Sequence, residues 1–132
     1  MWLLTYPESE YAELERIKEK KVKHFFINHG DSLLDRYAKK FYNNANIPFK
    51  IKKEGVDCDI GVFGDTIMQV YLPQFIKEKI EEIYKKCKNP SEVNIPDFIK
   101  NILNKEVTIQ LVLTNNKEIA DQLKQNVLNE FN

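Results

Sequence analysis

Residues 58–72 read Cys-Asp-Ile-Gly-Val-Phe-Gly-Asp-Thr-Ile-Met-Gln-Val-Tyr-Leu, and this segment gives the strongest short-range structural signal in the chain. Two runs rich in β-branched and aromatic residues, 58–63 and 66–72, are separated by Gly64 and Asp65. A Gly-Asp pair between two such runs is typical of a tight β-hairpin, because glycine tolerates the positive φ that the turn requires. The pattern therefore predicts a hairpin near the middle of the chain.

Helical and strand-like patterns flank this hairpin on both sides. Apolar residues at helical spacing predict helices over 10–21, 33–43, 74–86, 96–104 and 115–131. Buried or alternating apolar runs predict further strands over 22–28, 49–53 and 106–113. The order α-β-α-β-β-β-α-α-β-α predicts an α/β (mixed α+β) fold with a single mixed sheet and helices packed on it. We expect residues 1–21 to form an N-terminal linker and helix, and residues 22–132 to form one domain.

The last helix begins with a recognisable capping pattern. Asn115 followed by Glu118 resembles a capping box. In that motif the side chain of the first residue accepts a hydrogen bond from the backbone N–H of the residue three positions later, whose side chain accepts one from the backbone N–H of the first. The predicted core face of this helix consists of Ile119, Leu123, Val127 and Phe131. The apolar stripe of this helix or of 74–87 is a candidate dimer face, although core packing is the more ordinary use of each.

Charge and cysteine content exclude several classes of protein. The 132 residues carry 20 basic and 20 acidic side chains, and 18 of the basic ones are lysine, so a dedicated nucleic-acid binder is not expected. No apolar run approaches the roughly 20 residues of a membrane-spanning helix, and the first residues do not resemble a signal peptide. Cys58 and Cys87 lack metal-ligand spacing, which favours reduced, buried thiols in a cytoplasmic protein.

Two predicted turns, each between a strand and a helix, carry the candidate binding residues. Asn28, His29 and Ser32 follow the first strand, while Thr114 and Asn115 follow the last. Such side chains cap helices and also hydrogen-bond anions or small polar ligands. If the two strands are parallel neighbours, both turns line one crevice and form a ligand wall.

Signals for catalysis are weak. The serines and cysteines lie outside the local motifs of nucleophilic catalysis, and the four glycines form neither a phosphate-binding loop nor a dinucleotide fingerprint. Asp57, Asp59 and Asp65 cluster around the hairpin and would suit a divalent cation, but a solvated sheet edge explains them as well. His24 reads as a core histidine of the first strand. We expect no catalytic residue, no metal and no cofactor.

Two segments resemble a known family. The run Asp-Ile-Gly-Val-Phe-Gly-Asp-Thr-Ile-Met at 59–68, and the run Leu-Val-Leu-Thr-Asn-Asn-Lys-Glu-Ile-Ala-Asp-Gln-Leu at 111–123, are similar to the effector domain of archaeal winged-helix transcriptional regulators of the TrmB type. The resemblance covers roughly residues 22–132. It departs from the family in the long helical segment at 74–104 and in lacking the DNA-reading winged helix. The family is similar in fold to half of a phospholipase D domain, but this chain has no His-x-Lys-x-x-x-x-Asp signature.

The resemblance implies a regulatory domain that binds a small-molecule effector, forms a homodimer and contacts DNA only through a separate domain. Two other hypotheses remain. A small metal-assisted hydrolase would require His24, His29 and the three aspartates to converge on one cleft. A protein-interaction adaptor would pair through an exposed strand such as 49–53.

Overall fold

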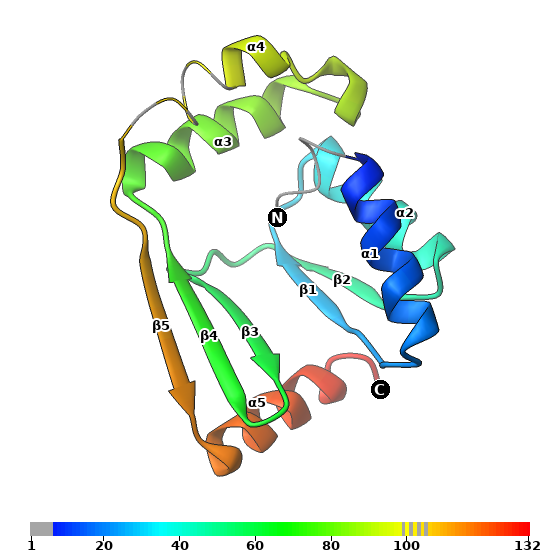
Figure 1. Ribbon diagram of the computed structural model, residues 1–132. Helices are drawn as coiled ribbons and strands as arrows, with labels where there is room; N and C mark the ends of the chain where they lie inside the picture. The colour runs from blue at the N-terminus through cyan, green and yellow to red at the C-terminus, as the bar shows by residue number, and fades with distance from the viewer. Residues whose placement is uncertain (1–6, 99, 101, 103, 105) are drawn as a thin grey trace.

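The structure is a computed structural model that describes residues 7–98, 100, 102, 104 and 106–132. Its class is mixed α+β, as predicted, with helices around two small groups of strands (Figure 1). The helices are α1 (Pro7–Glu19), α2 (Leu33–Asn44), α3 (Gln74–Lys86), the 3-10 helix η1 (Pro90–Glu92), α4 (Ile95–Phe98) and α5 (Lys117–Asn129). The strands are β1 (Phe26–His29), β2 (Phe49–Lys52), β3 (Asp59–Phe63), β4 (Thr66–Tyr71) and β5 (Gln110–Asn115).

The predicted single sheet is wrong, because the strands form two sheets. β1 and β2 form a parallel pair, and β3, β4 and β5 form an antiparallel sheet in that order. β5 pairs along the second edge of β4, with Leu113 opposite Met68, and is therefore not a neighbour of β1. Alternation in a sequence identifies a strand and its faces but leaves its partner open, which is why the sequence did not separate the two sheets.

The hairpin prediction is confirmed. Phe63 lies opposite Thr66, and Gly64 and Asp65 form the two-residue turn between them. Gly64 has a φ of 61°, whereas Asp65 is not among the positive-φ residues of the described chain. A glycine with positive φ at the first central position is the mark of a type II′ turn, whose twist matches that of the strands.

Several element boundaries differ from the predictions. β1 begins at Phe26, later than the predicted strand over 22–28, and includes His29. α1 begins earlier, at Pro7, and β5 begins later, at Gln110. Within the predicted helix over 96–104, α4 ends at Phe98, and residues 99, 101 and 103 lie outside the described residues.

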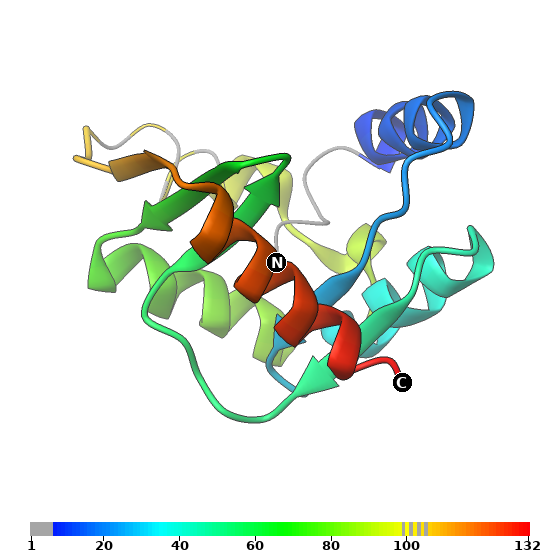
Figure 2. The same cartoon turned by 90° about the horizontal axis from the view of Figure 1, so that it is seen from below.

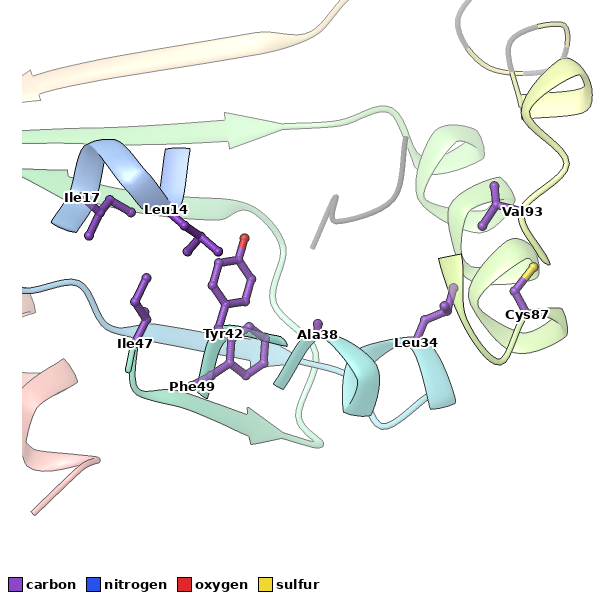
Figure 3. Close-up of a cluster of buried hydrophobic side chains, with 9 residues drawn as sticks. All are labelled: Leu14, Ile17, Leu34, Ala38, Tyr42, Ile47, Phe49, Cys87 and Val93. Carbon is purple, nitrogen blue, oxygen red and sulfur yellow. The ribbon is translucent and has the colours of Figure 1, made fainter. Parts of the chain in front are cut away.

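The larger buried cluster joins α1, α2 and β2 to the end of α3 (Figure 3). It consists of Leu14, Ile17, Leu34, Ala38, Tyr42, Ile47, Phe49, Cys87 and Val93. The rings of Tyr42 and Phe49 stack with centroids 5.5 Å apart, and the Tyr42 hydroxyl donates to Glu10 Oε2 at 2.6 Å. The predicted N-terminal helix thus packs into the same core as the elements that follow it.

A second, smaller buried cluster consists of Ile76, Phe98 and Ile102, and α3 contributes to both clusters. The predicted apolar stripe of α3 is therefore used in core packing. In Figure 1, α3 and α4 lie near one end of the strands and α5 lies near the other. No helix in the described part of the chain is long and apolar enough to cross a membrane.

Candidate functional site

A buried polar network occupies the turn between β1 and α2. The Asp35 side chain, only 5% exposed, accepts hydrogen bonds from Asn28 Nδ2 at 2.8 Å, Ser32 N at 2.8 Å and Ser32 Oγ at 2.7 Å. Asn28 is almost as deeply buried, at 6%. Two of the predicted ligand-wall side chains, Asn28 and Ser32, therefore bond to this carboxylate.

The local sequence explains why the network forms. Ser32 is the N-cap of α2, and with Asp35 three residues later it forms a capping box, which satisfies backbone donors at the start of the helix. Gly30 has a φ of +151°, and a Cβ added there would lie 2.7 Å from Asp35 Oδ2. Asp35 was missed in the sequence analysis, although the Ser-x-x-Asp spacing after the strand is a signal that identifies it.

His29 lies at the end of β1, opposite Lys52 of β2. Its Nδ1 donates a hydrogen bond to the carbonyl oxygen of Glu54, so Nδ1 carries the proton. In a neutral ring this bond leaves Nε2 as an acceptor. In this turn, His29 therefore offers its Nε2 atom as a hydrogen-bond acceptor for a ligand.

Thr114 and Asn115 lie in the other sheet, at the end of β5. Thr114 is opposite Ile67 of β4, and Asn115 is opposite Thr66. The proposed crevice was conditional on β1 and β5 being parallel neighbours, and the structure does not meet that condition, because β1 pairs with β2 and β5 pairs with β4 in a separate sheet. The structure therefore places three candidate residues at the β1–α2 turn and two at the end of β5, in the other sheet.

The cap of α5 also differs from the prediction. Asn116, not Asn115, is the N-cap, and its side chain accepts from Ile119 N at 3.1 Å. Ala120 is fully buried, and Ile119, which the sequence placed in the core, is 45% exposed.

Helix α5 is tied to both sheets by polar contacts at its two ends. At its start, Asn116 N donates to the Asp65 carbonyl in the hairpin turn at 3.0 Å. At its end, Lys50 Nζ donates to the Glu130 carbonyl at 2.7 Å and lies 3.0 Å from its carboxylate, which Lys52 also contacts. The bonds from Lys52 and then Lys50 lower the pKa of Glu130. Figure 2 shows α5 running between the two sheets.

The groups proposed for metal binding lie on different elements. Asp59 is in β3, Asp65 is in the hairpin turn and His29 ends β1, while His24 precedes β1 and is half-buried beside Phe26. No group of three or more His, Cys, Asp or Glu side chains that could hold a metal ion occurs among the described residues.

A small polar cluster beside the hairpin was also missed. Gln69 Nε2 donates to Tyr71 Oη at 3.1 Å and contacts Cys58 Sγ at 3.9 Å. Hydrogen bonding to Cys58, with that group's charge, raises the pKa of Tyr71. Cys87 is buried as expected, whereas Cys58 is only half-buried, and both thiols are free.

One face of the three-stranded sheet carries several exposed apolar side chains. Phe63, Leu111 and Leu113 are 60%, 54% and 63% exposed. The strand register places these side chains on the same face of the sheet as Met68 and Val70. The ring of Phe63 also covers Gly61, where an added Cβ would lie 2.7 Å from the ring.

Comparison of the chain with protein families, with characterised proteins and with solved structures finds no match, so its own residues and geometry carry the functional argument.

Proposed function

We propose that this chain is the regulatory domain of a transcriptional regulator, which binds a small-molecule effector, forms a homodimer and catalyses no reaction. In this proposal, DNA is contacted only through a separate domain, and the protein works in the cytoplasm without a cofactor. The two free thiols, Cys58 and Cys87, are consistent with a reducing compartment.

The segments that resemble the TrmB-type effector domain lie together in space. Residues 59–68 comprise β3, the turn and the start of β4, and residues 111–123 comprise most of β5 and the first half of α5. β4 and β5 pair directly, with Met68 opposite Leu113. A resemblance spread over distant parts of the chain thus corresponds to one continuous β-β-β-α unit.

The observation that carries the proposal is the attachment of α5 at both ends. The helix has 13 residues and is about 20 Å long at 1.5 Å per residue. Thr114 and Asn115 lie next to the start of α5. The end of α5 is hydrogen-bonded to Lys50 of β2, and β2 pairs with β1, which contains Asn28 and His29. A ligand that contacts residues at one end of α5 and binds more tightly when α5 is in one of two positions would favour that position. The movement of α5 would then change the residues at its other end.

Native mass spectrometry of the purified chain, before and after mild denaturation, tests this proposal. We expect a mass of twice 15.6 kDa with an additional small molecule that denaturation releases. The His29→Ala variant should carry less of that molecule, because it loses the ring nitrogen left as an acceptor. His24→Ala is the matched control and should retain it. A monomer without any bound molecule would contradict the proposal.

A protein-interaction adaptor is the second candidate, and the open edge of β5 favours it. Within the described chain, β5 pairs with β4 alone. An edge strand offers unpaired main-chain groups to a strand of another protein. Recovery of a 1:1 complex with a different protein, and of no homodimer, would favour this candidate over the regulatory domain. The hydrolase hypothesis has no assembled cation site in the described part of the chain.

A further inference from the structure

We propose that the free edge of β5 pairs antiparallel with the same strand of a second copy of this chain. The two three-stranded sheets would then form one continuous six-stranded sheet across the dimer. This inference depends on the homodimer in the proposed function and assigns it a surface.

The hairpin geometry indicates which main-chain groups of β5 are free. A two-residue turn joins Phe63 to Thr66, and the residues that close such a hairpin exchange both main-chain hydrogen bonds. Main-chain groups alternate in direction along a strand, so every second residue of β4 faces β5. The register then directs the amides and carbonyls of Gln110, Val112 and Thr114 toward β4.

The residues between them direct their main-chain groups away from β4. These outward residues are Leu111, Leu113 and Asn115. The bond from Asn116 N to the Asp65 carbonyl fits the same alternation, because Asn116 is two residues beyond Thr114. β5 therefore presents an edge with alternating donors and acceptors, and none of the other described strands pairs with it.

This edge lacks the features that usually keep sheet edges from pairing. Exposed edges commonly carry lysine, other charged residues, proline or a bulge. Residues 107–116 read Val-Thr-Ile-Gln-Leu-Val-Leu-Thr-Asn-Asn and contain no charged residue and no proline, although 30% of the chain is charged. Pairing this strand with itself therefore brings no like charges together.

The exposed side chains fit the same partner. Leu111 and Leu113 are on one face and are more than half exposed, as is Phe63 on β3. Side chains that lie opposite one another in an antiparallel pair are on the same face. Self-pairing would therefore bring these two leucines of each copy into one apolar row. Figure 2 shows α3 and α5 on one side of the three-stranded sheet, and no helix among the described residues covers the other side.

A second copy fits this edge because the pairing is symmetric. An antiparallel pair of identical strands has a two-fold axis, so each copy supplies the donors that the other copy needs. The pairing uses the only open edge of β5 and closes at two copies. The formal net charge of zero adds no long-range repulsion between the copies.

Sedimentation velocity of the purified chain over a concentration series, with three variants, tests the proposal. Leu113→Pro removes an outward amide but no bond to β4, and Leu113→Lys places a charge in the apolar row. Each should raise the dimer dissociation constant at least about tenfold, since each change occurs twice in the dimer. Val56→Lys changes a residue that is also about half exposed but lies outside the sheets, and it should dimerise like the parent chain.

Circular dichroism of each variant identifies any variant that fails to fold. If Leu113→Pro fails to fold, Leu113→Lys still tests the pairing. A parent dimer that both Leu113 variants leave intact would overturn the edge pairing while retaining the homodimer of the proposed function. A parent chain that is monomeric at all concentrations would overturn the edge pairing. Bound effector, measured separately by mass spectrometry, would then decide whether the sensing function stands.

Discussion

Replacing Asp35 by asparagine should destabilise the protein strongly, although the two side chains have the same shape. The carboxylate accepts three hydrogen bonds from Asn28 and Ser32, and its surroundings are closed to solvent. An amide has a single acceptor oxygen, so in either orientation its NH2 group faces a buried donor. A hydrogen bond to a charged group contributes about 1.5–3 kcal/mol, so we expect a loss of about 2 kcal/mol in the free energy of unfolding.

Urea unfolding followed by circular dichroism measures this loss. With a slope of about 1–3 kcal/mol per molar urea, the midpoint should fall by about 1 M. The control is Asp31→Asn, the same change in the same turn, where an exposed carboxylate pairs with Arg36 at 3.0 Å. An exposed pair contributes at most about 1 kcal/mol, so its midpoint should move much less. Coincident curves for the two variants would refute the role assigned to the buried carboxylate.

Three further predictions follow from single contacts. Glu130→Gln should loosen the end of α5, seen as faster amide exchange there. Because the pKa of Glu130 is lowered, this effect should persist above the ordinary glutamate value of 4.5 and disappear as pH falls through the lowered pKa; an effect that grows in acid would contradict it. Gly30→Ala should cost about 2 kcal/mol from positive φ and overlap, whereas Gly55→Ala, with open space around it, should be nearly neutral in thermal unfolding. Tyr42→Phe should cost about 1 kcal/mol and increase proteolysis within α1, because it removes the bond to Glu10; unchanged cleavage would contradict that role.

The sequence was informative where structure depends on nearby residues. The turn at Gly64 and the strands beside it follow from local backbone preference, and they were predicted correctly. The range of α3 was also predicted, because its apolar stripe repeats at helical spacing. Ser32, one of the residues named for the first turn, is the cap of α2, and its capping box with Asp35 is a pattern of nearby residues.

The sequence was uninformative about which strands are neighbours. β5 has the alternation of a strand with one buried face, yet its Leu111 and Leu113 are exposed. Burial depends on which elements cover a face, and that is decided by long-range packing. The crevice between the two turns failed for the same reason, since it depended on β1 lying beside β5. The core face of α5 also differs from the prediction, since Ala120 is buried and Ile119 is exposed.

The edge of β5 is the feature on which the account depends most, and amide hydrogen exchange measured by NMR tests it residue by residue. At low protein concentration, the amides of Val112 and Thr114 should be protected by β4, while those of Leu111 and Leu113 exchange freely. At concentrations where the dimer forms, we predict that Leu111 and Leu113 also become protected. Dimerisation without any change in their exchange rates would contradict the proposed interface.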